Sequence, residues 1–250
     1  MEREVFSLST DGIFSSSLRY IDRRLESFKK GGAVTTEIVE VNGRHQLAVK
    51  FDGSRKVTSA LVDAIADVVI TDCKYHYIES SLNLPINDEI SRHAFIRALS
   101  NFDHTQDLCI AKSLIKLTPN FLLDSFYTFS LDALKARWQE VCALANENAC
   151  FLVCDGTFRE LLRFLISNLE SRHAEVHLFQ HADRVEVLSG NLKPVDIYVN
   201  DELPPDSQII STLISIAPKR IFLHKDTSSN PVFDFIRDLF RGCVQIVQTT

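Results

Sequence analysis

The stretch that decides the fold of this chain is Val34-Thr-Thr-Glu-Ile-Val-Glu-Val-Asn-Gly-Arg-His-Gln-Leu-Ala-Val-Lys-Phe51. Two runs rich in β-branched and apolar residues flank Asn42-Gly43, a pair that tolerates the positive φ angles of a tight hairpin turn. The sequence therefore predicts an antiparallel hairpin with strands at 34–41 and 44–51. Alternation predicts one buried face, made by Val39 and Val41 together with Leu47, Val49 and Phe51.

A helix is predicted before this hairpin, because five apolar residues recur at steps of three and four and so share one helical face. They are Phe14, Leu18, Ile21, Leu25 and Phe28. Asp11 can cap the start of this helix, and Gly31-Gly32 can end it. We expect the hairpin to pack on its apolar face.

The opposite face of this helix carries basic residues that Asp and Glu interrupt, which is typical of a solvated helix face. The basic residues are Arg19, Arg23, Arg24, Lys29 and Lys30. The formal net charge of the chain is -6, so it has no general attraction to phosphate backbones. Binding to nucleic acid through this face is the weakest hypothesis, and we expect no nucleic acid partner.

The rest of the chain reads as a helical middle followed by a tail of alternating strands and helices. Expected helices of the middle are a stripe from 57 to about 78, 88–100, 106–117, 120–129, 131–146, and one that starts at the capping box of Thr157 and Glu160. Expected elements of the tail are strands 175–180, 184–188 and 195–199, helix 205–216, strand 220–224, helix 231–240 and strand 243–247.

These elements predict an α+β fold in three segments. They are an N-terminal helix plus β-hairpin (1–55), a helical middle segment (56–172) and a C-terminal mixed α/β sheet segment (173–250). A single compact domain is the alternative, because no Gly/Ser linker separates the segments.

The composition predicts a globular protein of the cytoplasm. Of 250 residues, 45% are hydrophobic, which is enough for a sizeable core without disulfides. The chain opens with Met1-Glu2-Arg3-Glu4, which is unlike a secretory signal, and no run approaches the ~18 apolar residues that span a bilayer. We therefore expect no membrane insertion. The six cysteines form no CxxC pair, and we interpret them as free thiols.

Three histidines, His173, His177 and His181, fall at four-residue intervals. On a helix this spacing would stack three imidazoles as metal ligands. The segment 175–180 reads as a strand, however, where residues four apart lie roughly 13 Å from each other and cannot share one ion. We interpret the three as surface histidines on a strand and its flanks.

Three cysteines, Cys142, Cys150 and Cys154, could share a helical face and bind a soft metal. The segment from Cys150 to Cys154 is apolar throughout, and no His or further Cys pair stands nearby in the sequence to complete a tetrahedral set. We interpret them as buried packing residues.

The chain has neither a GxSxG nucleophile elbow nor a phosphate-binding glycine loop. We therefore assign no catalytic, cofactor-binding or metal-binding residue and expect no cofactor and no enzymatic activity. The alternative is a metal- or small-molecule-dependent enzyme whose site is assembled from distant residues, such as His177, His181 and Cys154.

Several segments, taken in order, resemble the YtxC-like family over roughly the last two-thirds of the chain. They are Phe121 to Phe126 running into Leu131 to Leu134, Phe158 to Phe164, Glu175 to Leu178, and Leu213 to His224. The resemblance implies a cytosolic protein of endospore-forming bacteria that is associated with sporulation and has no established activity, so it carries over no site residues. We expect a sporulation-associated protein that acts through contacts with an unknown protein partner or with itself.

Overall fold

The computed structural model describes residues 4–83, 86, 88–148, 155–181, 184–199, 203–225 and 230–248. The chain forms two compact units, each made of two stretches of sequence. The first unit comprises Met1–Tyr77 and Asp103–Glu140, and the second comprises Ile78–Phe102 and Val141–Thr250. Each unit contains its own four-stranded sheet.

The sheet of the first unit has the strand order β2-β3-β1-β4. Its strands are β1 (Glu4–Thr10), β2 (Val34–Val41), β3 (Arg44–Phe51) and β4 (Asn120–Leu122). β1 and β2 pair antiparallel with β3, whereas β4 pairs parallel with β1. The predicted hairpin is confirmed, with φ angles of 53° at Asn42 and 75° at Gly43.

The buried face of this hairpin differs from the prediction in its first strand. Leu47 and Val49 of β3 are fully buried as expected, but Leu47 lies opposite Ile38 in β2. Val39 and Val41 lie opposite Gln46 and Arg44, on the other face of the sheet. The hydrophobic pattern of β2 alternates weakly, so it could not fix which of its faces turns to the core.

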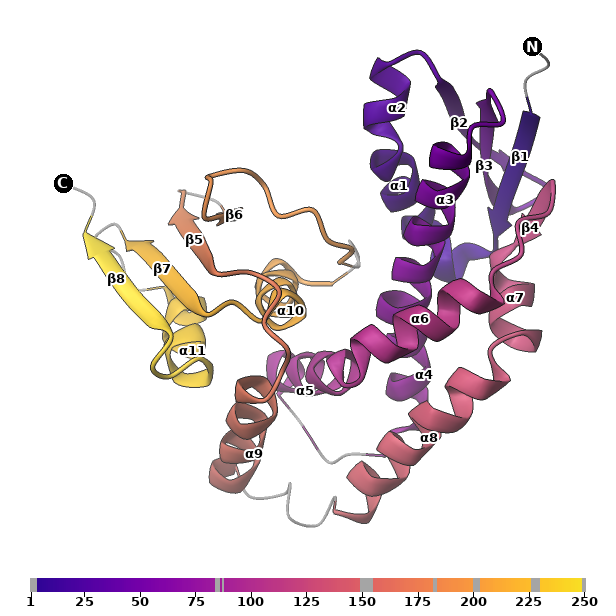
Figure 1. Ribbon diagram of the computed structural model, residues 1–250. Helices are drawn as coiled ribbons and strands as arrows, with labels where there is room; N and C mark the ends of the chain where they lie inside the picture. The colour runs from indigo at the N-terminus through magenta and orange to yellow at the C-terminus, as the bar shows by residue number, and fades with distance from the viewer. Residues whose placement is uncertain are drawn as a thin grey trace. The chain divides into compact units, whose positions relative to one another are not determined.

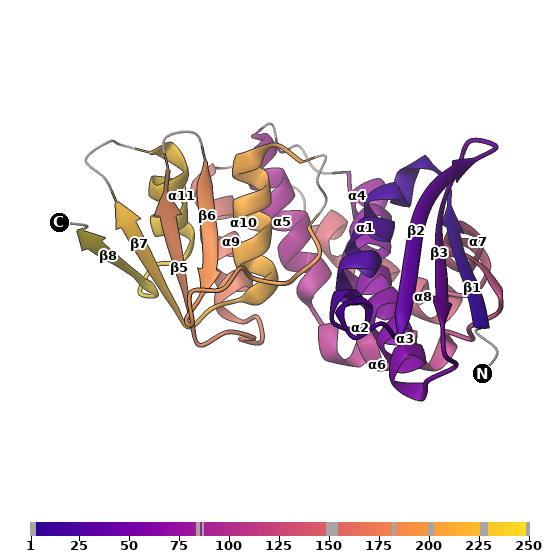
Figure 2. The same ribbon diagram turned by 90° about the horizontal axis from the view of Figure 1, so that it is seen from above.

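Helices cover one face of this sheet, and Figure 2 shows α1 and α3 along the same side of it. The helical elements that belong wholly or partly to this unit are η1 (Gly12–Phe14), α1 (Ser15–Arg24), α2 (Glu26–Lys30), α3 (Arg55–Val68), η2 (Val69–Cys73), α4 (Lys74–Ser81), α6 (His104–Leu114), α7 (Leu123–Phe129) and α8 (Asp132–Glu147). η2 is a π-helical turn between α3 and α4.

Three local predictions for the first unit were wrong, and one strand was missed. The expected helix from Phe14 to Phe28 is divided at Leu25 into α1 and α2, and Phe14 occupies the N-cap position that we expected for Asp11. β1 was not predicted at all. Residues 120–122 form β4 instead of the first turn of a helix, because they pair with β1 before α7 begins.

The sheet of the second unit has the strand order β6-β5-β7-β8 (Figure 1). The elements that belong wholly to this unit are α5 (Glu89–Asn101), α9 (Asp155–Ser167), β5 (Glu175–Gln180), β6 (Val185–Ser189), α10 (Pro205–Ile216), β7 (Arg220–Lys225), α11 (Pro231–Leu239) and β8 (Val244–Gln248). β5, β7 and β8 are parallel, and β6 pairs antiparallel with β5.

The predicted alternation of strands and helices in the tail is confirmed, with two differences. Residues 195–199 form no strand, and the only bridge there joins Leu188 to Pro194. Thr157 lies inside α9, which begins at Asp155, so it is not the helix cap. With helices and mixed sheets in both units, the α+β fold class is confirmed.

Candidate functional site

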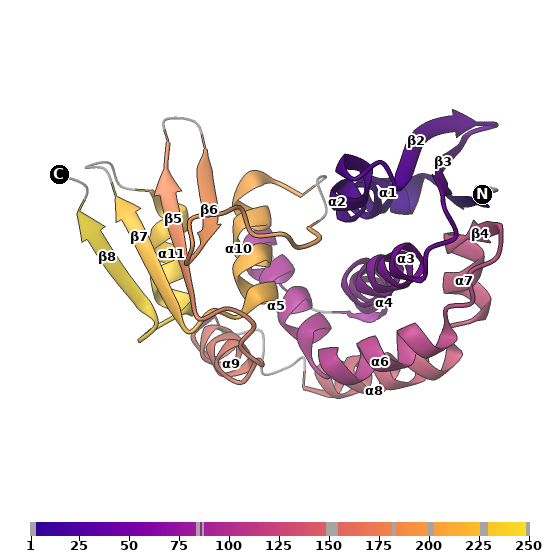
Figure 3. The ribbon, with the colours of Figure 1, turned by 45° about the horizontal axis from the view of Figure 1, so that its top comes forward.

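Alternation along the strands of the second sheet separates a covered face from an open face. Val176 and Leu178 of β5, and Ile221 and Leu223 of β7, are at most 1% exposed. They belong to the face that α10 and α11 cover, and Figure 3 shows both helices along one side of the sheet. The intervening residues of β5 and β7 therefore point to the opposite side.

Four aromatic rings lie together on this open face. They are His177, Phe179, Phe222 and His224, and we call them the ring array. The parallel register sets His177 beside Phe222 and Phe179 beside His224. The rings of Phe179 and His224 stack with their centroids 4.1 Å apart and their planes 9° apart, and those of His177 and Phe222 stack at 4.8 Å and 13°. All four side chains are half-buried.

The two imidazoles of the ring array are joined by a hydrogen bond, with His177 Nδ1 2.9 Å from His224 Nε2. One of these nitrogens donates its N–H and the other accepts. Burial, and secondly the neighbouring His177, lower the pKa of His224 below that of an ordinary histidine. The lowered pKa favours the neutral form of His224.

The geometry of this pair does not suit a bridging metal ion. The ring centroids are 5.1 Å apart, and the nitrogens take up 2.9 Å of that separation. The rest of the distance between the centroids equals about one ring radius for each imidazole. Both nitrogens therefore lie on the line between the two centroids and point directly at each other. A metal at ~2 Å from both nitrogens needs lone pairs that converge on a third point. The arrangement fits a proton between the rings.

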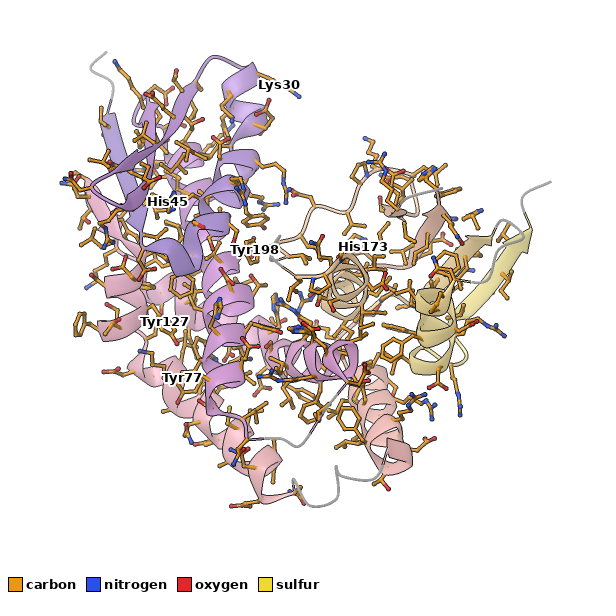
Figure 4. The ribbon with its side chains drawn as sticks, turned by 180° about the vertical axis from the view of Figure 1, so that it is seen from behind. Lys30, His45, Tyr77, Tyr127, His173 and Tyr198 are labelled. Carbon is orange, nitrogen blue, oxygen red and sulfur yellow. The ribbon has the colours of Figure 1, made fainter. Side chains whose placement is uncertain are left out.

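The three histidines that the sequence singled out are in different surroundings. His177 belongs to the ring array, whereas His181 follows the end of β5 and lies 3.4 Å from the exposed Glu186 carboxylate. His173 precedes β5 (Figure 4). Sequence reasoning missed the role of His224 as the partner of His177. A signal was available in the two predicted strands, 175–180 and 220–224. If these strands pair in parallel, the alternation of their side chains places both histidines on one face of the sheet.

The cysteines are dispersed. Cys142 and Cys73 are buried, Cys243 is half-buried and Cys109 is exposed, and these four are free thiols. Burial raises the pKa of Cys73 well above the ordinary value, which makes its thiolate unfavourable. Cys150 and Cys154 lie outside the described residues. Within the described parts of the chain, no three His, Cys, Asp or Glu side chains are grouped so that they could hold a metal ion.

The first unit contains a buried charge cluster that the sequence did not reveal. Lys74 Nζ lies 2.7 Å from Asp107 Oδ2, and both side chains are at most 2% exposed. Asp107 also accepts hydrogen bonds from Trp138 Nε1 at 2.9 Å and Arg137 Nε at 3.1 Å. Burial lowers the pKa of Lys74, although Asp107 acts in the opposite direction. Three donors occupy this carboxylate, so it serves as a structural tie between α4, α6 and α8.

The basic face of the N-terminal helices is offset by acidic neighbours. Lys29 Nζ lies 2.9 Å from Asp22 and 3.1 Å from Glu26. Arg24 lies 3.9 Å from Asp67. Lys30 extends from the end of α2 (Figure 4), and its Nζ is 4.0 Å from Glu26. This face therefore presents mixed charge and no continuous basic stripe.

Among the helices that the structure describes, none is both long enough and apolar enough to cross a membrane. A search of curated proteins and a search of solved structures each found no match. The model of the YtxC-like family matches residues 76–245, about two thirds of the chain. The chain therefore belongs to the YtxC-like family.

Proposed function

We propose that this chain is a sporulation-associated protein of the bacterial cytoplasm, that it is not an enzyme, and that it acts by binding another protein through the ring array. Membership of the YtxC-like family supports the association with sporulation. The observation that carries the mode of action is the ring array itself, because its four rings lie on the face of the second sheet that α10 and α11 leave open.

The chemistry of this face indicates what kind of partner it takes. Glu175 and Arg220 lie at the start of the same strands and neutralise each other, with 3.3 Å between carboxylate and guanidinium. The two imidazoles next to them are joined by a hydrogen bond, and the lowered pKa of His224 favours its neutral form. An uncharged centre made of flat rings favours a partner that brings apolar or aromatic side chains, which stack on such rings. Burial of Phe179 and Phe222 would supply the free energy of binding.

The role in sporulation is tested in an endospore-forming host that carries this gene. Deleting the gene is expected to lower the number of heat-resistant spores, and the wild-type gene is expected to restore it. Normal spore numbers in the deletion strain would contradict the association with sporulation.

The role of the ring array is tested in the same strain with two matched variants. Phe222→Glu places a charge within the array and is expected not to restore spore formation. Phe129→Glu places the same charge on a side chain that is already 77% exposed in the first unit, and it is expected to restore spore formation. Far-ultraviolet circular dichroism of both purified variants checks that they fold.

Affinity capture from sporulating cells separates binding from other effects of these variants. A protein retained by the wild type and by Phe129→Glu, but lost with Phe222→Glu, is the expected result. If Phe222→Glu restores spore formation and retains the same proteins as the wild type, the ring array is not the binding surface.

A further inference from the structure

We propose that two copies of this chain associate through β8, the outer strand of the second sheet, by antiparallel pairing about a two-fold axis at Ile246. Figure 1 shows β8 at the free edge of that sheet. This pairing stands independently of the sporulation role, since it depends only on the backbone and side chains of one strand.

The backbone of β8 has unused hydrogen-bonding groups along its outer edge. The N–H of Ile221 in β7 donates to the C=O of Cys243 at 2.8 Å. Along a strand the peptide groups alternate in direction, so Gln245 and Val247 turn theirs toward β7 and the residues between them turn theirs outward. The outward groups belong to Val244, Ile246 and Gln248. Within the described residues, no strand pairs with this edge.

An axis at Ile246 pairs all of these outward groups. Ile246 then lies opposite Ile246 of the second copy, and Val244 lies opposite Gln248 of the second copy. In an antiparallel ladder, some opposite residues point both their N–H and their C=O toward each other. Such a pair exchanges two hydrogen bonds. A shift of one residue would set inward-facing groups against the new strand and lose these bonds. The five residues of β8 are therefore complementary to themselves.

The side chain of Ile246 is incompletely covered in one copy alone. It lies opposite Leu223 in the parallel register, so both belong to the covered face of the sheet. Leu223 is 1% exposed, whereas Ile246 is 50% exposed. Pairing about Ile246 places two isoleucines side by side on this face, and each removes apolar surface of the other from water.

The other edges of the two sheets have the usual protections against pairing. β2 carries Glu37 and Glu40, and charged residues on an edge strand discourage pairing. Residues after β6 fold back over its edge. There the backbone N–H of Ser189 donates to the Lys193 C=O at 2.8 Å, and Leu188 forms an isolated β-bridge with Pro194. β8 has no charged residue. Among the described strands longer than three residues, β8 alone forms an edge without charge or cover.

The protected edge of β6 also determines the form of the assembly. A head-to-tail contact between β8 and β6 of another copy would build a filament, but β6 is covered. A contact of β8 with itself closes after two copies. Stable protein interfaces bury roughly 1,200–2,000 Å², and a five-residue strand pair is small by that standard. The expected state is therefore a reversible equilibrium between monomer and dimer.

Light scattering on the purified chain over a range of concentrations tests the association. The wild type is expected to shift from monomer to dimer as concentration rises, and Ile246→Lys is expected to weaken the dimer by about tenfold or more. The matched control is Ile38→Lys, since Ile38 is 41% exposed and also lies on the core side of an edge strand. Only monomer at every concentration, or equal dimerisation of Ile246→Lys and the wild type, would overturn the proposal.

Cross-linking of Ile246→Cys tests the register. Two residues on the axis of an antiparallel pair have Cα atoms about 5.5 Å apart, which is within the range of a disulfide. Oxidised glutathione is expected to convert Ile246→Cys into a covalent dimer faster than it converts Ile38→Cys or the wild type. Equal rates for the three proteins would overturn the pairing about Ile246, even if the wild type dimerised, because another surface would then hold the two copies together.

Discussion

The buried pair of Lys74 and Asp107 supports a quantitative prediction about the first unit. Replacing Asp107 by Ala leaves the Lys74 ammonium buried without its carboxylate, and it removes the acceptor of the Trp138 N–H. Removal of one partner from a buried ion pair typically costs about 3–5 kcal/mol of unfolding free energy, because the remaining charge is not solvated. We expect a loss of that size for Asp107→Ala.

Urea unfolding followed by fluorescence measures this loss directly. Trp138 is the single tryptophan of the chain, and it lies within the cluster, so its emission follows the unfolding of the first unit. The control is Asp63→Ala. Asp63 forms an ion pair with Lys112 at 2.8 Å, but its side chain is 41% exposed. A pair so exposed contributes about 1 kcal/mol or less.

A double variant separates the ion pair from the packing around it. In Lys74→Met with Asp107→Leu neither charge remains, so we expect it to be more stable than Asp107→Ala alone. Circular dichroism in the far ultraviolet provides a second measure of unfolding that does not depend on the environment of Trp138. If Asp107→Ala loses no more free energy than Asp63→Ala, the reasoning about the buried charge is refuted.

Three further predictions concern single residues. Because the pKa of His224 is lowered in the folded protein, the unfolded chain binds more protons as the pH falls below the ordinary histidine pKa of about 6.5. The free energy of unfolding should therefore decrease as the pH falls from about 6.5 to the lower pKa of the folded protein. Urea titrations at several pH values should show a smaller decrease for His224→Gln than for the wild type. Equal decreases in the two proteins would argue against the lowered pKa. Gly43 has a φ of 75°, so Gly43→Ala should lower the free energy of unfolding, measured with urea, by about 1–2 kcal/mol. The control is Gly12→Ala. The φ of Gly12 is not positive, and no atom lies within 4 Å of an added Cβ there, so this variant should lose clearly less. The Oγ of Ser54 accepts a hydrogen bond from the Lys56 N–H at 3.3 Å at the start of α3, so Ser54→Ala should lower stability by about 0.5–2 kcal/mol and Ser54→Asp should retain most of it; an equal loss for both would exclude capping as the cause.

Local signals predicted the elements that depend on neighbouring residues. Asn42-Gly43 indicated the first hairpin because its backbone angles are a property of those two residues. Pro205 and Pro231 marked the starts of α10 and α11. At the first helical position the N–H has no partner within the helix, so a proline, which has no N–H, costs no hydrogen bond there. These features need no knowledge of distant partners.

The errors lie where a distant partner decides the outcome. Residues 120–129 were predicted as one helix, yet residues 120–122 first pair with β1, more than a hundred residues earlier in the chain. The segment 195–199 has strand-like composition, but no neighbouring strand pairs with it. The contact of His177 with His224 depends on the register of two strands that are 47 residues apart. Neither register nor pairing can be read from a single periodic segment.

The pairing of β4 with β1 bears on how the protein is made. The ring of Phe121 in β4 lies 6.5 Å from Phe6 in β1 and is 5% exposed. During synthesis on the ribosome, the first sheet therefore lacks β4 until residue 122 has emerged, long after β1, β2 and β3 have been synthesised. A fragment cut at residue 76, where the family match begins, would carry β4 without β1 and would expose Phe121, so such a fragment is expected to aggregate where the whole chain folds.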